Sequence, residues 1–297
     1  MNKIEFQKEV QVYMEEKLKQ FNKYQLITWD ILVYLNSLLR DNNITYYLAY
    51  GTLLGAIRDN GQIPWDYDVD IHVKVSDRER LIEVLRTKLS EDYYYVYSDK
   101  MGNYPAECLR VCKKGYTYMA FHVDVFFLCG CADSKQERIP LLKLARTWSN
   151  FRSHKYANYH FDETDKFSKL KQLLLKVYSV RYKVIPEWYI KRQEKKIHYT
   201  YEIEKCKYLM SYCFEANWGD NEYEVYPSEI FNEAIDITIN GVQLLVPKGY
   251  DQYLKILFKD YMRYYPIEGR FKEFYYQCEQ IEKRQAYFEK YLQHKIK

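Results

Sequence analysis

The amino-acid sequence predicts an α+β fold, and three observations carry this prediction. Hydrophobic residues recur with helical spacing over residues 5–40, whereas apolar and polar residues alternate over residues 69–75 as in a strand. Residues 121–128 form another, more apolar strand. Residues 141–210 are rich in Lys, Leu and Tyr, with Pro186 at a helix boundary, and indicate a helix-rich C-terminal half. We therefore expect a sheet flanked by helices.

Shorter elements complete the predicted order. Residues 44–50 are β-rich and end at Gly51-Thr52, and Asp59-Asn60-Gly61 is a turn signal. Asn240-Gly241, between two alternating runs, predicts a hairpin with a type I′ turn. The other expected elements are a short helix over 53–58, an amphipathic helix over 78–89, a hairpin over 235–246 and a helix over 251–261.

Length and charge narrow the class of protein. The chain has 297 residues and a mass of 36.3 kDa, which is enough to bury a sizeable core. Its 45 Lys and Arg against 41 Asp and Glu give a net charge of +4, which does not favour nucleic-acid binding. No apolar run approaches the ~18 residues of a membrane span, and the charged N-terminus is unlike a secretory signal. We expect a cytoplasmic protein, with peripheral contact at the inner face of the membrane left open.

Three aspartates at alternate positions carry the clearest chemical signal. Asp66, Asp68 and Asp70 point to one side of an extended chain, because side chains at i and i+2 share a face of a strand. Carboxylates about 7 Å apart at the backbone repel each other unless a cation lies between them. Mg²⁺, with Mn²⁺ as the alternative, takes such oxygen ligands. The pattern predicts a metal site at Asp68 and Asp70, and solvated aspartates at a strand edge are the other interpretation.

A phosphate-binding segment precedes these aspartates. Gly51 allows close backbone approach, Thr52 offers a hydroxyl group, and the helix that follows presents backbone N–H groups to an anion. Arg58 could add a bidentate contact to a phosphate, or lie solvated at the helix end. Together with Asp66, these residues form the predicted substrate- and phosphate-binding set.

Asp124 is the third candidate carboxylate. It lies in the middle of the apolar strand over 121–128 and needs a partner there. A metal ion shared with Asp68 and Asp70 is one such partner, and a structural Arg or Lys is the other. His122 lies on the same side by the period of two, and we assign it no catalytic role.

Residues 51–71 read GTLLGAIRDNGQIPWDYDVDI and resemble the signature of the LicD family of phosphocholine transferases, which includes the fukutin-type transferases. The later aspartate strand of the family is similar to HVDVFF at 122–127. The C-terminal portion of the family is similar to VPKGYDQYL at 246–254 and KDYMRYYP at 259–266. The resemblance covers about residues 25–130 and 225–270.

The sequence departs from the family pattern at two places. Family members commonly carry three consecutive acids after the Trp, whereas Tyr67 stands at the middle position here. Near the C-terminus the family often has Tyr-Gly before Asp-Tyr, and this chain has Phe258-Lys259. Residues 131–225 match no part of the family pattern.

The resemblance implies a nucleotidyltransferase fold with a mixed sheet and Mg²⁺-dependent transfer of a phosphorylated alcohol. The implied donor is CDP-choline or another CDP-alcohol, and CMP would leave. The implied acceptor is a hydroxyl group of a cell-surface glycan, such as teichoic acid or lipopolysaccharide, or of its lipid-linked precursor. Asp68, Asp70 and Asp124 would be the catalytic and metal-binding residues, and Asp124 would draw the acceptor proton.

A soft boundary near residue 135 divides the expected organisation. Residues 1–135 would hold the N-terminal helices and the nucleotidyltransferase-like catalytic core. Residues 136–297 would complete the site with helices and a hairpin, and would bind the acceptor. One compact unit is the alternative.

Two other functions stay open. The same carboxylates serve a strict nucleotidyltransferase, which would move a nucleoside monophosphate to a small molecule or macromolecule and release pyrophosphate. A non-catalytic scaffold that keeps the fold is the third hypothesis, and the three intact aspartates argue against it.

Two surface and cysteine features are also left open. Residues 166–196 carry ten Lys and Arg against two Glu, and are either a solvated helical face or a surface for anionic lipid. In the second case, an apolar group would dip into the lipid interface: Leu173, Leu174, Leu175 and Val177.

Reduced thiols are favoured over a zinc site for four irregularly spaced cysteines: Cys108, Cys112, Cys129 and Cys131.

Overall fold

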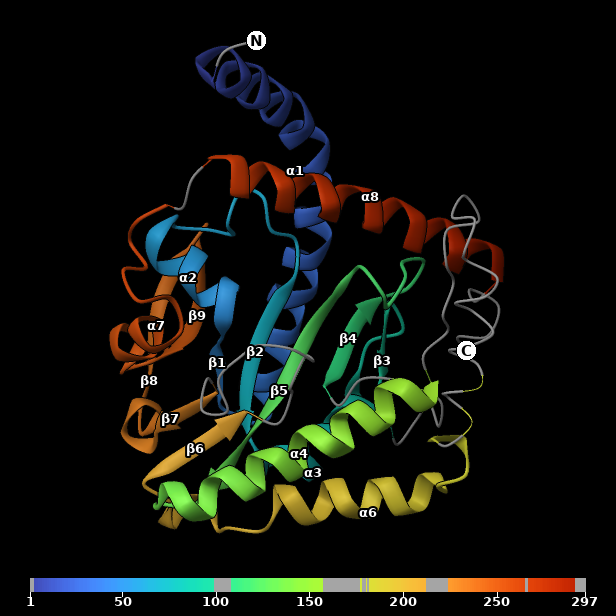
Figure 1. Ribbon diagram of the computed structural model, residues 1–297, viewed down its shortest axis with the longest axis vertical. Coiled ribbons are helices and arrows are strands. Elements are labelled where there is room, and N and C mark those ends of the chain that lie inside the picture. Colours follow the sequence, from blue (N-terminus) through green and yellow to red (C-terminus); the bar gives the residue numbers. More distant parts are fainter. Residues whose placement is uncertain are drawn as a thin grey trace. The chain divides into compact units, whose positions relative to one another are not determined.

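The computed structural model describes residues 3–98, 108–156, 182–211, 224–264 and 267–291, together with Val177 and Val180. Its helices and strands confirm the α+β class (Figure 1). The chain divides into two compact units, each built from separate stretches of sequence. Unit 1 comprises Met1–Tyr95, Arg110–Val125 and Glu229–Lys297, and unit 2 comprises Val96–Leu109 and Phe126–Ser228. The division at residue 135 stays a prediction.

A mixed sheet with the strand order β1-β2-β5-β4-β3 runs through unit 1. β1 and β2 are antiparallel, with Tyr46 opposite Val73 and Leu48 opposite Ile71. β2 and β5 run in the same direction (Figure 1). The strand bounds are Tyr46–Leu48 (β1), Val69–Lys74 (β2), Tyr93–Val96 (β3), Leu109–Lys113 (β4) and His122–Cys131 (β5). Every residue of β5 is buried, which makes this strand the centre of the core.

Helices from both ends of the chain pack together in unit 1. Gln25 of α1 donates from Nε2 to the carbonyl oxygens of Ile63 at 2.9 Å and Asp66 at 2.6 Å, and so holds the loop before β2. α8, which the sequence analysis did not predict, packs on α1 with Phe274 against Phe21 at 4.9 Å between ring centroids. The helix bounds are Lys3–Asp41 (α1), Tyr50–Arg58 (α2), Arg78–Lys88 (α3), Tyr250–Phe258 (α7) and Ile267–Tyr291 (α8).

The predicted hairpin is present in unit 1 and is antiparallel, with Ile239 opposite Val242. Its strands are β8, Ala234–Ile239, and β9, Val242–Pro247. Asn240 (φ 49°) and Gly241 (φ 78°) both have positive φ, as a type I′ turn requires. Three short 3-10 helices lie elsewhere in the described chain, at Val75–Asp77, Ile203–Lys205 and Ser228–Phe231.

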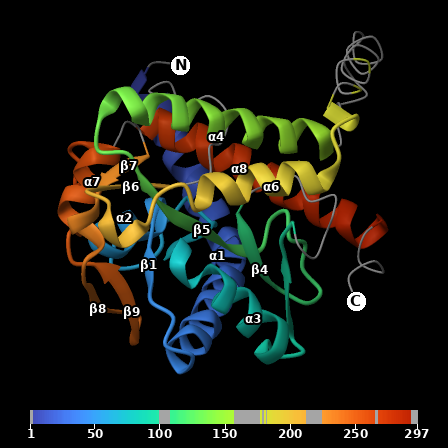
Figure 2. The same ribbon diagram turned by 90° about the horizontal axis from the view of Figure 1, so that it is seen from below.

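Unit 2 packs α4, Lys135–Tyr156, along α6, Glu187–His198 (Figure 2). Arg152 of α4 is fully buried and bonds the Glu194 carboxylate through Nε at 2.6 Å and Nη2 at 2.7 Å. Its Nη1 donates to Glu187 at 3.0 Å. An ion-pair cluster therefore joins the two helices.

The end of β5 also belongs to unit 2. It pairs with β6, Tyr208–Ser211, which pairs with β7, Val225–Pro227, and both pairings are antiparallel. α6 begins directly after Pro186, as predicted. β6 corrects the helical prediction that ran to residue 210, because Leu209 and Met210 are buried in a strand that extends the sheet from β5. In the described part of the chain, no helix is both long and apolar enough to cross a membrane.

Candidate functional site

The three alternating aspartates lie where the chain enters β2. Asp70 is half-buried in β2, whereas Asp68 precedes the strand and is exposed. Tyr67 and Val69 are buried, so burial alternates through this segment as the sequence predicts. Asp68 and Asp70 were expected on a buried-looking strand. Their side of the chain is accessible instead, because Tyr67 and Val69 take the core side.

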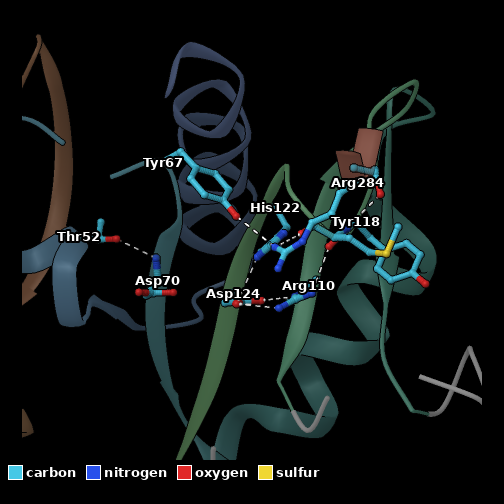
Figure 3. A network of polar contacts seen from close by, with 10 residues as sticks. Thr52, Tyr67, Asp70, Arg110, Tyr118, His122, Asp124 and Arg284 are labelled. Carbon is cyan, nitrogen blue, oxygen red and sulfur yellow. Dashed lines mark hydrogen bonds and ion pairs between the residues drawn. The ribbon is translucent and has the colours of Figure 1, made fainter. Parts of the chain in front are cut away.

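The first turn of α2 lies against this aspartate segment. Gly51 and Thr52 were predicted to end a strand. They belong to a helix instead, because α2 begins at Tyr50. Thr52 is buried, and its Oγ1 accepts the backbone N–H of Asp70 at 2.8 Å (Figure 3). A Cβ on Gly51 would lie 2.8 Å from Oδ2 of Asp66, so glycine admits that carboxylate. The structure thus brings Gly51, Thr52, Asp66 and Asp70 together.

Tyr50 starts α2 in a left-handed conformation, with φ 43°. Its N–H donates to the hydroxyl of Tyr253 at 3.2 Å, and this hydroxyl lies 3.0 Å from Nε2 of His72 on β2. Tyr253 belongs to α7 and to the run VPKGYDQYL. Tyr253, in the C-terminal segment that resembles the family, therefore stabilises the strained first residue of α2 through a hydrogen bond.

The end of α2 is packed against the loop that leads to the aspartates. A Cβ on Gly55 would lie 2.6 Å from the carbonyl oxygen of Gly61, so the loop crosses the helix at van der Waals distance. Arg58 pairs with Asp59 at 2.9 Å, and its guanidinium lies 4.2 Å from the centre of the Tyr264 ring. The Tyr264 hydroxyl donates to Asp59. Arg58 thus contacts both Asp59 and Tyr264, and its predicted contact to a phosphate stays a prediction.

Asp124 is buried on β5 and is paired with an arginine. Arg110 of β4 donates from Nε to Oδ1 of Asp124 at 2.7 Å and from Nη2 to Oδ2 at 3.4 Å (Figure 3). Its Nη1 donates to the carbonyl oxygen of Tyr118 at 3.2 Å. His122 lies on the same face, with Nε2 3.3 Å from Oδ2 of Asp124. Of the two partners considered for Asp124, the structure shows the arginine.

These contacts fix the charges of the two buried residues on β5. Burial alone would raise the pKa of Asp124, but Arg110 and then His122 hold that pKa below its ordinary value, so Asp124 is ionised. Burial, followed by Arg110, lowers the pKa of His122 despite Asp124, so the ring is uncharged at neutral pH. Nδ1 of His122 is buried and has no hydrogen-bond partner among the described residues. We therefore assign the ring proton to Nε2, where it faces Asp124.

Arg284 of α8 reaches the same region from the far end of the chain. Its Nη1 donates to the carbonyl oxygen of Met119 at 2.9 Å and approaches the Tyr67 hydroxyl at 3.4 Å (Figure 3). Gln285 donates from Nε2 to the carbonyl oxygen of Gly115 at 3.2 Å. α8 thus fixes the loop that precedes β5.

Two cations of the site, Arg110 and Arg284, were not among the residues predicted from the sequence. Arg110 had a local signal, since it alternates with apolar residues in the short strand LRVCK. Arg284 had none, because nothing near it in the sequence distinguishes it from the other basic residues of a polar helix.

The carboxylates fit a divalent cation held by two protein ligands. Asp68 and Asp70 share the accessible side of their segment. Within the residues that the structure describes, no group of three or more His, Cys, Asp or Glu side chains is placed to hold a metal ion. Mg²⁺ usually takes one or two carboxylates, keeps water ligands and adds substrate phosphates, so such a pair suffices. The four cysteines considered for zinc are buried thiols: Cys108, Cys112, Cys129 and Cys131.

Known proteins are similar to this chain in sequence. Residues 43–154 match the family described as LicD/FKTN/FKRP, nucleotidyltransferase domain. Over 257 residues the chain is 29% identical to the lipopolysaccharide cholinephosphotransferase LicD of Haemophilus influenzae, and the match covers 83% of this chain and 92% of that protein. Residues 43–154 of this chain are thus similar to the LicD/FKTN/FKRP nucleotidyltransferase domain.

Shorter matches link this chain to two uncharacterized proteins. It is 36% identical over 74 residues to a protein of Rickettsia prowazekii, which is 24% of this chain and 28% of that protein. It is 36% identical over 77 residues to a protein of Rickettsia typhi, which is 26% of this chain and 23% of that protein. The LicD match over 43–154 encloses α2, the aspartate segment, Arg110 and Asp124. These matches confirm the resemblance to the LicD family that the sequence indicated.

Proposed function

We propose that this protein transfers phosphocholine from CDP-choline to a hydroxyl group of a lipopolysaccharide-type glycan or its lipid-linked precursor, with release of CMP. The observation that carries the proposal is the similarity to a lipopolysaccharide cholinephosphotransferase over 83% of this chain. In this reaction the acceptor oxygen forms a bond to the choline-bearing phosphorus. The bond from that phosphorus to the CMP oxygen breaks, and the acceptor hydroxyl loses its proton. We place the reaction at the cytoplasmic face of the membrane.

Asp68 and Asp70 are the residues that would hold Mg²⁺, or Mn²⁺ in its place. The bound ion would neutralise charge on the donor phosphates as the leaving group separates. The accessible side of the two aspartates supports this assignment, since a phosphate-bearing donor must reach the same ligands.

Thr52 is proposed to orient the donor. Its Oγ1 accepts the Asp70 N–H, so the hydroxyl keeps its own proton for donation to a phosphate oxygen. The same hydrogen bond fixes α2 against β2. The Thr52 side chain would therefore position both the donor phosphate and Asp70, the proposed metal ligand.

Asp124 was assigned to drawing the acceptor proton, and its surroundings qualify that role. Arg110 and His122 keep the pKa of Asp124 below its ordinary value, and a weakly basic carboxylate is a poor proton acceptor. Asp124 can serve as the base only when the Arg110 guanidinium moves away from it. While the pair is closed, Asp124 orients Arg110.

The test is a product assay with the purified protein, Mg²⁺, CDP-choline and lipopolysaccharide that lacks phosphocholine. We expect CMP release that depends on the glycan, with phosphocholine gained by the glycan. CDP-ethanolamine and CDP-glycerol in parallel reactions identify the alcohol. Release of pyrophosphate from CTP, with no CMP from any CDP-alcohol, would instead establish the strict nucleotidyltransferase that the name of the matched domain also allows.

A further inference from the structure

The outward side of α6 in unit 2 has an unusual composition. Five exposed residues lie along it, four in α6 and one directly after the helix: Trp188, Arg192, Lys195, Lys196 and Tyr199. These positions are spaced i, i+4, i+7, i+8 and i+11, which places them on one side of a helix. The opposite side holds Ile190, Glu194 and Ile197, which are buried. We call the first group the α6 outer face.

No acidic residue of α6 balances the charge of this face. The two acids of α6, Glu187 and Glu194, both bond to the buried Arg152 of α4. Both negative charges of α6 are thus paired with Arg152, with Glu194 buried and Glu187 half-buried. The α6 outer face is left with the positive charge of Arg192, Lys195 and Lys196.

Large apolar side chains lie in water beside these cations. Trp188 is 63% exposed and Val184, just before α6, is 74% exposed. Val177 and Val180 precede them and are exposed as well. A Trp close in sequence to Lys and Arg is the composition that favours the boundary between lipid headgroups and acyl chains.

We infer that the α6 outer face, together with Val184, docks on an anionic membrane surface. Lys195, Lys196 and Arg192 would contact lipid phosphates, while Trp188 and Val184 would enter the boundary with the acyl chains. This assigns the predicted lipid contact within 166–196 to α6. Leu173, Leu174 and Leu175, the residues first considered for it, lie outside the described residues. The inference rests on unit 2 alone and does not depend on the proposed transfer.

The test is flotation of the purified chain with vesicles of phosphatidylglycerol and phosphatidylcholine, against vesicles of phosphatidylcholine alone. We expect binding to the anionic vesicles at low salt and its loss at high salt, because the attraction of exposed cations is screened. The phosphatidylcholine vesicles also control for capture of a phosphocholine headgroup by the transferase site. Equal binding to both vesicle types, or none to anionic vesicles at low salt, would overturn the inference.

Two variants separate the charged and apolar contributions. Replacing the three cations together (Arg192→Gln, Lys195→Gln, Lys196→Gln) should weaken binding to anionic vesicles roughly a hundredfold, taking about fivefold for each cation near the surface. Trp188→Phe should abolish a blue shift of tryptophan emission on vesicle binding. In the described chain, Trp188 is the exposed tryptophan, whereas Trp65 is buried.

A control variant removes exposed cations from α3, outside the α6 outer face. Arg86→Gln with Lys88→Gln alters two exposed cations of α3 and should leave vesicle binding unchanged. The α6 variant should retain wild-type CMP release with a soluble glycan acceptor, so failure of docking and failure of transfer are distinguishable. Binding of the α6 variant equal to wild type would show that another surface, or none, meets the membrane.

Discussion

The guanidinium of Arg110 bonds the carboxylate of Asp124 at 2.7 Å, and both side chains are largely withdrawn from solvent, with 19% and 10% of their surface exposed. From the place of this carboxylate on an apolar strand, a metal ion and a structural Arg or Lys were both left open as its partner, and the family resemblance implied the metal ion. The ion pair satisfies the requirement that led to this prediction, since a buried carboxylate needs a cation and an arginine supplies one. The pair is therefore a structural unit of the protein without metal.

Breaking this pair from either side should destabilise the fold. Arg110→Gln leaves a buried carboxylate without a cation and should lower the free energy of unfolding by about 3 kcal/mol. Asp124→Asn leaves the arginine without a counter-charge and should also lower the free energy of unfolding. Urea unfolding of the two variants and the double variant should give a coupling of about 1–3 kcal/mol.

The exposed pair Arg86 and Glu83 on α3 provides the control for this cycle. Its atoms are 2.6 Å apart, but 67% and 55% of the two side chains are exposed. The same cycle there should give a coupling below about 0.5 kcal/mol. Strict additivity at Arg110 and Asp124 would show that their contact does not hold the native state.

Asp70→Asn should abolish turnover and leave the fold intact. The amide keeps the size of the side chain and the backbone N–H that Thr52 accepts, but it removes a charge from the proposed metal ligands. We expect turnover to fall about a thousandfold or more, and the Mg²⁺-dependent rise in melting temperature to vanish. Asp41→Asn, at the exposed end of α1, is the control and should behave as wild type. Near-normal turnover in the Asp70 variant would remove the metal assignment.

His122 should make the protein less stable in mild acid. Burial, followed by Arg110, lowers its pKa in the folded state, so the unfolded chain, with a pKa of about 6.5, binds the proton first as pH falls. Stability should therefore fall by up to about 1.4 kcal/mol per pH unit below about pH 6.5, until the folded state also binds the proton. His122→Gln keeps an N–H donor and does not titrate. Subtracting its unfolding free energies from those of wild type should show this slope, and parallel profiles would contradict it.

Lys259→Gly should stabilise the protein. Lys259 ends α7 with φ 55° and ψ −108°, a conformation that glycine adopts and a side chain resists. This is the position where the chain departs from the Tyr-Gly of the family pattern. Relief of the strain should raise the free energy of unfolding by about 1 kcal/mol. Lys259→Ala, which removes the lysine but keeps a Cβ, should change it by less than about 0.5 kcal/mol.

Much of the local structure follows from the sequence because its signals act over a few residues. The alternation from Asp66 to Asp70 correctly placed three acids on one side of the chain, since side-chain direction repeats every two residues. Asn240-Gly241 correctly predicted the hairpin turn, since its positive φ values suit these two residues. Because these signals act over a few residues only, the first turn of α2 was wrongly predicted to be the end of a strand. The Tyr253 hydroxyl, which accepts the Tyr50 N–H at the start of this turn, lies 203 residues away in the sequence.

The charge environment of the site was decided by the tertiary structure alone. Arg110 meets Asp124 because β4 lies beside β5, and the order of strands in a sheet leaves no periodic mark on the sequence. Arg284 reaches Tyr67 across 217 residues because α8 folds back onto α1. Side-chain spacing fixes which residues share a face of one element. Which elements become neighbours depends on the burial of whole faces. This packing placed Arg110 beside Asp124, whereas the sequence had left either a metal ion or a structural cation as the partner of that carboxylate.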